Sequence, residues 1–298
     1  MKYTNKFNLP PSLVDAIIGQ TYDPSDGDPK RIGITTLIGS PRVRLLTTRH
    51  WKELEEDVAD HIWRITGSAY HYILAKIDEK NRMIEEKFIE KVDDYTIVGK
   101  LDNYEHLTHT IEDYKVTSVW AVKLGVKEDW IEQLNCYAWL LRKAGHEVKD
   151  MFINAILRDW RRGEQKKYDD YPPIPFMRLK IKLWTFEEQE AFVKERVALY
   201  KEAQAIENDN ELPLCSAKER WAKDDTYAVM KNSNKTATRV LECAKKADEY
   251  IEYITGVDKK KGQTHSYKVV KRDGGDLRCT DYCLVAQKCS YYKEKYGG

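Results

Sequence analysis

The spacing of apolar residues changes twice along the first half of the chain, and this limits the folds that it can adopt. Residues 50–76, "HWKELEEDVADHIWRITGSAYHYILAK", place apolar side chains at helical spacing interrupted at Gly67, which predicts two consecutive helices. From about Tyr95 the spacing becomes two, in "YTIVGKLDN" and "HTIEDYKVT". These runs predict a β-hairpin whose turn lies near residues 105–107.

Helical spacing then returns, and an apolar run follows it. Residues 128–145, "EDWIEQLNCYAWLLRKAG", carry acids in the first turn and a glycine at the end, as a helix with a natural stop does. Residues 150–160, "DMFINAILRDW", fit a buried strand. Thr185 and Glu188 have the spacing of a capping box that opens a long helix. The order predicts an α/β fold with a small mixed β-sheet flanked by helices.

Length and charge constrain the organisation of the protein. The 298 residues are enough to bury a full core. We expect a core with N-terminal helices over residues 1–207 and a mostly helical, cysteine-bearing C-terminal extension over residues 208–298. The 50 Lys and Arg residues nearly balance the 49 Asp and Glu residues, giving a formal charge of +1. Because so small a net charge creates no general attraction to polyanions, any nucleic-acid site must be local.

Targeting signals are missing from the sequence. The start, "MKYTNKFNLPPSLVDAI", lacks the long apolar segment of a signal peptide, and no run approaches the roughly 18 apolar residues of a membrane span. The sequence therefore predicts a cytoplasmic protein with no membrane partner. Six cysteines in a reducing compartment are expected to bind metal or to be buried rather than to form disulfides.

Charged residues inside the predicted hairpin point to a metal site. Residues two apart in a strand share a face, so Asp113 and Lys115 point to one side while Glu112 and Tyr114 point to the other. Asp102 on the partner strand is expected to converge with Asp113. Two facing carboxylates repel each other unless a cation lies between them, and Mg²⁺ is the simplest such ion. Lys115 would add positive charge where a phosphate gathers negative charge, which suits phosphodiester hydrolysis.

A simpler interpretation stays open, because an Asp-x-Lys pair is often only a solvated strand edge. The following helix carries Gln133 and Tyr137, which lie one turn apart on one face. If these two residues had no functional role, Tyr137 would be a core residue and Gln133 a surface residue.

The motifs "GKLD", "IEDYK" and "QLNCY", in this order, resemble those of the PD-(D/E)XK nuclease superfamily. Within it they are similar to the RecB-like exonucleases, which include CRISPR-associated and phage-encoded members. The resemblance covers about residues 32–160 well and implies a restriction-endonuclease-like core. The chain departs from the commoner pattern at "IEDYK", where Asp113 stands in place of Glu; a carboxylate one methylene shorter keeps the ligand chemistry.

The resemblance implies roles for individual residues. Asp102 and Asp113 would be metal ligands, with the backbone carbonyl of Tyr114 as a third, and Lys115 would be the catalytic lysine. His71, in the helical run "GSAYHYILAK", would be a further metal ligand and would make Mn²⁺ a good substitute for Mg²⁺.

Other residues match elements of the same family around the metal. Gln133 and Tyr137 match the Q-x-x-x-Y element that positions DNA near the scissile phosphate. Glu86 matches an accessory acid upstream of the first strand, with Glu85 and Glu90 as competing candidates.

The cysteines suggest a second metal site. Four thiols are enough for one tetrathiolate site: Cys215, Cys279, Cys283 and Cys289. Cys136 and Cys243 are expected to be buried small hydrophobic residues. RecB-like nucleases of the iron-staple type resemble this arrangement, which implies a structural [4Fe-4S] cluster, although their lone cysteine usually precedes the nuclease core. A structural Zn²⁺ ion and reduced thiols without metal are the alternatives.

The resemblance and the residues together predict a Mg²⁺- or Mn²⁺-dependent DNA exonuclease that serves recombination, repair or DNA end processing, in a phage-infected or bacterial cell. Its partners would be DNA and a helicase or recombination protein. A structure-specific or restriction-type endonuclease on the same core is one alternative. A catalytically silent DNA-binding module is another, although a pure binder has no reason to keep buried like charges.

Overall fold

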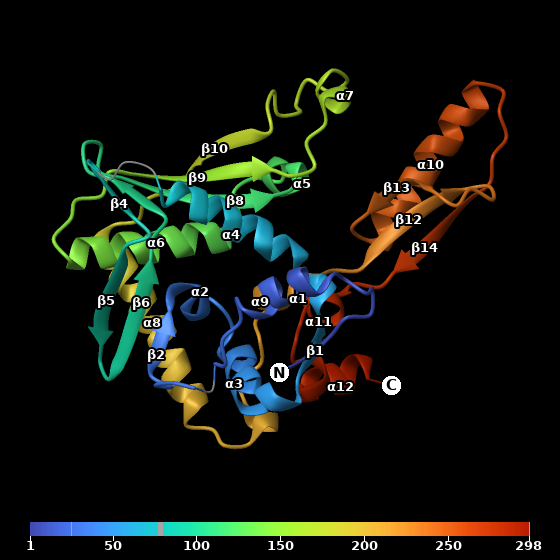
Figure 1. Cartoon of the computed structure of the whole chain (residues 1–298). Helices are drawn as coiled ribbons and strands as arrows, with labels where there is room; N and C mark the ends of the chain where they lie inside the picture. Colours follow the sequence, from blue (N-terminus) through green and yellow to red (C-terminus); the bar gives the residue numbers. More distant parts are fainter. Residues whose placement is uncertain (25, 77–79, 298) are drawn as a thin grey trace. The chain divides into compact units, whose positions relative to one another are not determined.

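The computed structural model describes residues 1–24, 26–76 and 80–297 (Figure 1). The chain divides into two compact units, Met1–Pro213 and Leu214–Gly298. The boundary expected from the sequence lies between residues 207 and 208. Among the described residues, no helix combines the length and the apolar composition needed to cross a bilayer.

The first unit mixes helices and short strands, so it is an α/β structure. Its helices are α1 (Pro11–Ile18), α2 (Ile34–Leu37), α3 (Pro41–His50), α4 (Ile62–Leu74), α5 (Val119–Lys123), α6 (Glu128–Lys143), α7 (Arg162–Gln165) and α8 (Phe186–Gln204). Its strands are β1 (Lys2–Thr4), β2 (Arg31–Gly33), β3 (Glu55–Asp57), β4 (Arg82–Ile84), β5 (Lys87–Val92), β6 (Tyr95–Lys100), β7 (Asn103–Glu105), β8 (Thr110–Thr117), β9 (Asp150–Leu157) and β10 (Phe176–Lys180).

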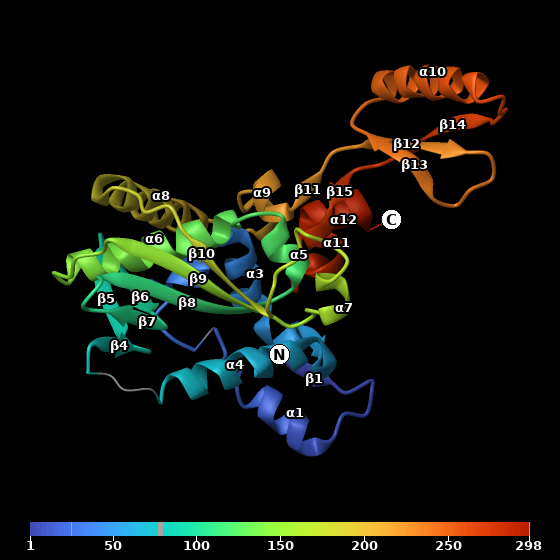
Figure 2. The ribbon, with the colours of Figure 1, turned by 90° about the horizontal axis from the view of Figure 1, so that it is seen from above.

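The main sheet has five strands in the order β10-β9-β8-β7-β4. Strands β8 and β9 run parallel, in register from Thr110 opposite Asp150 to Thr117 opposite Leu157. The other pairs are antiparallel, so the predicted mixed sheet is confirmed. Helices α4 and α6 both contact β8 and lie below the main sheet in Figure 1. Figure 2 shows the same layers from above.

The predicted hairpin is only partly correct, because the chain changes sheets inside the first run. Strand β6 joins a separate sheet in the order β2-β6-β5, whereas β7 pairs with β8. Leu101 and Asp102 connect the two sheets, and the turn of the β7–β8 hairpin spans residues 106–109. Gly99 explains why β6 can lie so close to α6: a Cβ there would approach Tyr137 Cδ1 to 3.0 Å and would clash with Leu140.

The helix predictions are correct where apolar spacing was strong. Helix α6 is largely buried and ends before Gly145, whose φ of 88° suits glycine. Helix α8 begins with the predicted Thr185–Glu188 capping box. The predicted break at Gly67 is wrong, since Gly67 lies inside α4. A Cβ at Gly67 would meet nothing within 4 Å, so this glycine only lowers helix propensity; the interruption lies instead at residues 51–61.

The second unit is not mostly helical, which corrects the expectation for the extension. Its helices are α9 (Ala217–Arg220), α10 (Ala244–Lys260), α11 (Leu277–Asp281) and α12 (Ser290–Tyr296). Its strands are β11 (Ala222–Lys223), β12 (Thr226–Lys231), β13 (Ala237–Leu241), β14 (Tyr267–Arg272) and β15 (Gly275–Asp276). The order β13-β12-β14 forms an antiparallel sheet against α10. Polar and basic residues on the exposed face weaken the apolar pattern that would have signalled these strands.

Candidate metal centre

Two carboxylates meet where the β7–β8 hairpin ends. The ladder pairs Asn103 with Glu112, and one further step in this register brings Asp102 opposite Asp113. The Tyr114 backbone N–H donates a hydrogen bond of 2.8 Å to Asp102 Oδ2, which fixes this side chain at the strand edge. Asp113 is only 2% exposed. The convergence predicted from strand geometry is therefore present.

His71 and a glutamate complete a compact group of possible ligands. His71 Nδ1 lies 3.2 Å from Glu85 Oε1 and 3.4 Å from Asp102 Oδ1. These three residues each offer a ligand atom, and the three atoms lie within 4.8 Å of one another. The Glu85 backbone N–H also donates to the Asp102 carbonyl at 3.2 Å, so the chain itself holds these two acids side by side.

Glu85, and not the predicted Glu86, is the acid beside the centre. Glu86 is exposed, and its carbonyl accepts a hydrogen bond of 3.1 Å from the Leu101 N–H. Glu85 has a left-handed backbone with a φ of 53°, between β4 and β5. This backbone conformation decides which of the neighbouring acids points towards the centre. It cannot be recognised from the sequence.

Lys115 and Gln133 contact the two oxygens of the Asp113 carboxylate. Lys115 Nζ lies 2.8 Å from Oδ2, an ion pair on the face that the sequence predicts. Gln133 Nε2 donates to Oδ1 at 3.2 Å and also lies 3.3 Å from the Tyr137 hydroxyl. Despite the nearby ammonium, Asp113 Oδ2 accepts no well-formed hydrogen bond from any described residue. A buried carboxylate oxygen in this state is suited to a cation.

Gln133 and Tyr137 do not face outward as expected for residues that touch DNA. They are 7% and 6% exposed, respectively. Through its bond to Asp113, Gln133 orients a candidate ligand, and Tyr137 packs behind it. Lys100 is a residue that sequence reasoning missed, because its ion pair joins the end of β6 to Glu85 in the β4–β5 connection. A lysine directly after the glycine of "GKLD" is the only sequence signal for it.

The electrostatics of the centre favour a cation. Burial raises the pKa of Asp102 to about 7, and the negative charge of Asp113 adds to the rise. Burial also raises the pKa of Asp113, which Lys115 opposes. Burial, with the Asp113 charge second, raises the pKa of the Tyr137 hydroxyl. Each raised pKa means that a negative charge is unfavourable at this position. A bound divalent ion would offset this unfavourable free energy.

The donor set fits Mg²⁺ or Mn²⁺. Carboxylate oxygens are the ligands that Mg²⁺ prefers, and one imidazole suits Mn²⁺ as well. The Tyr114 carbonyl faces the same strand edge as its N–H, because both backbone groups of a strand residue point to one side. That edge carries Asp102, so Tyr114 fits the predicted backbone ligand.

The four predicted cysteine ligands all belong to the second unit. Cys215 precedes α9, Cys279 lies in α11, Cys283 follows α11, and Cys289 caps α12. Burial raises the pKa of the Cys279 thiol to about 11, and negative charge on each of the other three thiols and on Asp276 adds to the rise. The other three sulfurs therefore lie within electrostatic range of Cys279.

Two kinds of metal centre that four thiols can hold differ in the sulfur spacing that they need. Within the described part of the chain, groups of three ligand atoms within 4.8 Å occur at His71, Glu85 and Asp102 and not among the cysteines. A tetrahedral zinc ion with bonds near 2.3 Å would hold its sulfurs about 3.8 Å apart. A cubane cluster binds each thiolate to a different iron and so needs a wider arrangement. Either centre would use the same four thiols as ligands.

Asp276 joins the segments that carry the cysteines, although no sequence pattern singles it out. Its carboxylate is 2% exposed and accepts hydrogen bonds from Arg220 (3.0 Å), Tyr291 (2.7 Å), Lys295 (2.9 Å) and Tyr296 (3.0 Å). Burial alone would raise the pKa of Asp276, but these bonds outweigh it and hold the pKa well below its usual range. Arg220 also donates to the Cys215 carbonyl, which ties this cysteine to the group.

The two remaining cysteines differ from each other. Cys136 is fully buried in α6, as expected, and burial raises the pKa of its thiol. Cys243 is only half-buried and precedes the first residue of α10, so the expectation of a buried side chain is met only in part.

Comparison with known proteins adds little to this picture. No family model matches the chain, and no curated protein matches it. Among solved structures, the chain is similar to one described as "Crystal structure of SSO0001", with 16% sequence identity and a TM-score of 0.43. The similarity covers 63% of this chain and 84% of that chain.

Proposed function

We propose that the protein is a metal-dependent deoxyribonuclease, an exonuclease built on a restriction-endonuclease-like core. The observation that carries the proposal is the meeting of Asp102, Asp113 and Lys115 at one strand edge, with His71 and Glu85 against Asp102. Buried carboxylates with raised pKa values beside a lysine destabilise the folded protein when they are charged. They are common where metal ions and phosphates react.

The residues of the chain have separate tasks in this proposal. A divalent cation, when bound, would activate water and stabilise charge on the scissile phosphate. The Tyr114 N–H and Gln133 hold the carboxylates of Asp102 and Asp113, respectively, in fixed orientations. Lys115 keeps an ammonium 2.8 Å from Asp113, where it stabilises negative charge that gathers on phosphate oxygens.

We further propose a structural [4Fe-4S] cluster at Cys215, Cys279, Cys283 and Cys289. The proposal is supported by the electrostatic effect of the other three thiols on the Cys279 thiol and by the placement of all four cysteines in the second unit. The cluster would tie together segments of the second unit that are far apart in sequence, so its role would be structural. Zinc stays the alternative ion for the same four ligands.

Nuclease assays on two forms of DNA test the proposed function. End-labelled linear DNA and a covalently closed circle are incubated with the protein, with and without Mg²⁺ or Mn²⁺. The exonuclease proposal predicts that only linear DNA is degraded, and only with metal. Cleavage of the circle would favour the endonuclease alternative. Binding without cleavage under every metal condition would favour the silent DNA-binding module.

A further inference from the structure

A pocket opens where the two parallel strands of the main sheet end. Strand β8 leads into α5 at Val119, and β9 leads through Asp159 and Arg161 into α7. The space between these segments has a volume of about 490 Å³, within the range of small-molecule sites. A neighbouring hollow of about 450 Å³ shares Lys123 and Tyr171 with it. Ligands of α/β proteins commonly bind at this carboxyl edge of parallel strands.

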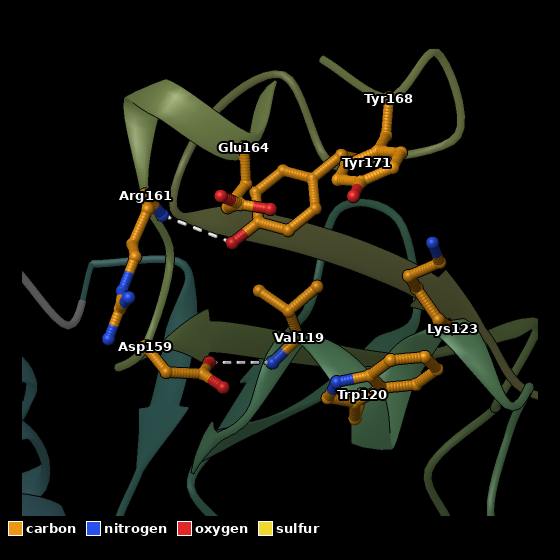
Figure 3. A pocket seen from close by; sticks show the side chains of 8 residues that line it. All are labelled: Val119, Trp120, Lys123, Asp159, Arg161, Glu164, Tyr168 and Tyr171. Carbon is orange, nitrogen blue, oxygen red and sulfur yellow. Dashed lines mark hydrogen bonds between the residues drawn. The ribbon is translucent and has the colours of Figure 1, made fainter. Parts of the chain in front are cut away.

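The frame of the pocket is held by hydrogen bonds. Asp159 Oδ1 accepts from the Val119 N–H at 2.7 Å, and the Tyr171 hydroxyl accepts from the Arg161 N–H at 3.1 Å (Figure 3). Trp160 Nε1, between Asp159 and Arg161 in the chain, donates to the Pro172 carbonyl at 2.7 Å. A pocket fixed in this way needs little ordering when a ligand binds.

Exposed aromatic rings stand on opposite sides of this space. Figure 3 shows Trp120 on one side, with Tyr168 and Tyr171 across the opening. Trp120 is 68% exposed and Tyr168 is 54% exposed, which is unusual for such large apolar side chains. Lys123 Nζ lies 5.6 Å from the centre of the Trp120 ring. Exposed rings that face an open pocket are suited to stack on a flat ligand.

The charges of the pocket favour a nucleobase over a phosphate. Arg161 and Lys123 are balanced by Glu164 and Asp159 among the lining residues. A phosphate would be repelled by Glu164, whereas the edge of a base carries both donors and acceptors and can use both kinds of residue. The Asp170 carboxylate also pairs with Lys123 at 2.6 Å, which lowers the attraction for a bare anion.

The pocket lies close to the candidate metal centre along the same strand. Val119 follows Lys115 by four residues, so their α-carbons are at most about 14 Å apart. This reach corresponds to a few nucleotides of a DNA strand. A base held at Trp120 must be out of its duplex, since both faces of a paired base are covered by stacking.

We propose that the pocket between α5 and residues 158–171 binds an unpaired nucleobase of the DNA strand that is cleaved, with Trp120 as the stacking platform. The inference rests on the proposed function and assigns its substrate: single-stranded or frayed ends. Exposed Trp120 can be replaced without opening the core, which keeps the test free of folding effects.

Binding of a fluorescent oligothymidine, measured by anisotropy without divalent metal, tests the pocket apart from cleavage. Trp120→Ala should weaken binding about 5- to 150-fold, which corresponds to the loss of one stacked base, and Trp120→Phe should keep most of the affinity. Phe7→Ala, which removes another exposed ring, is the control and should bind as wild type does. Cleavage with Mg²⁺ should favour single-stranded over blunt duplex ends.

An abasic scan of the same oligonucleotide sharpens the result. One base of the oligonucleotide is removed at a time. At one position, the removal should weaken binding to the wild-type protein but should not weaken binding to Trp120→Ala any further. Identical scans for both proteins, or affinity of Trp120→Ala within twofold of wild type, would overturn the pocket assignment alone. If the wild-type protein binds no single-stranded or duplex DNA, the proposed function fails and the inference fails with it.

Discussion

Buried carboxylates in the two units have opposite surroundings. Asp113 in the first unit and Asp276 in the second are each 2% exposed. Asp276 accepts hydrogen bonds from four side chains, and its pKa is lowered. Asp113 faces one lysine and one glutamine, lies near Asp102, and has a raised pKa. The difference separates a carboxylate that four side-chain donors stabilise from one that has fewer donors and a second carboxylate beside it.

This contrast distinguishes stability from function. A carboxylate with enough donors holds segments together and needs nothing from solution. A pair of carboxylates with too few donors destabilises the folded chain, and such a pair persists where it serves a task. Replacing each aspartate by asparagine should therefore produce opposite results: lost activity with retained stability at Asp113, and lost stability at Asp276.

The largest expected effect is on cleavage in Asp113→Asn. Because metal stabilisation of the transition state is worth several kcal/mol, the rate should fall below about one thousandth of wild type. Thermal stability should be unchanged or higher, since a buried like charge is removed. Cleavage rates and melting temperatures of both proteins check this. If the variant kept a tenth of the wild-type cleavage rate, the proposed role of Asp113 in cleavage would be contradicted.

Asp276→Asn should destabilise the second unit by about 3 kcal/mol, because Arg220 and Lys295 lose a buried partner. Anaerobically purified variant should also lose the brown colour and iron of the proposed cluster. Denaturant unfolding and iron analysis measure both. Asp273→Asn is the matched control: Asp273 is 82% exposed, so its loss should cost at most about 0.5 kcal/mol. Equal stability of the two variants would contradict the role of Asp276.

Gln133→Ala tests whether this side chain serves the metal or the DNA. Since Gln133 orients Asp113, its loss should raise the Mg²⁺ concentration needed for half-maximal cleavage roughly tenfold. Tyr137→Phe keeps the Gln133–Asp113 bond and should change this concentration less. Slower cleavage at an unchanged Mg²⁺ requirement would instead support the DNA-contacting role that the sequence predicts.

The smallest expected effect is on the pH dependence of stability in the metal-free protein. The folded pKa of Asp102 is raised to about 7 from an ordinary value of 3.8. Its contribution to stability is therefore present at low pH and lost as pH rises through about 7. Unfolding in the presence of a chelator should show a stability loss of at least about 1 kcal/mol between pH 5.5 and 8, the worth of one pKa unit. Asp102→Asn should lack this component.

The convergence of Asp102 and Asp113 could be predicted from the sequence, because it depends only on strand periodicity and a short hairpin. The change of sheet at Leu101 could not, since the residues of β6 and β7 follow each other with no turn signal, and the close approach of Gly99 to α6 is a tertiary contact. The choice of Glu85 depends on a single backbone angle that neighbouring acids do not reveal.

Other features escaped prediction because they join distant segments. The partners of Asp276 lie 56 residues before it and 15 to 20 residues after it, with no periodic pattern among them. The pocket residues Trp120, in α5, and Tyr168, after α7, meet because the parallel neighbours β8 and β9 lead into these two segments. Local spacing therefore predicted that Asp102 and Asp113 lie close together, whereas tertiary contacts decided what surrounds them.

Binding of Mn²⁺ to the protein without DNA tests the central claim most directly. The electron paramagnetic resonance signal of free Mn²⁺ can be titrated with wild-type protein and with Asp102→Asn. If the acids around His71 form a metal centre, wild type should bind Mn²⁺ in a saturable way, and Asp102→Asn should bind it at least about tenfold more weakly. Equal affinity of the two proteins for Mn²⁺ would contradict the claim.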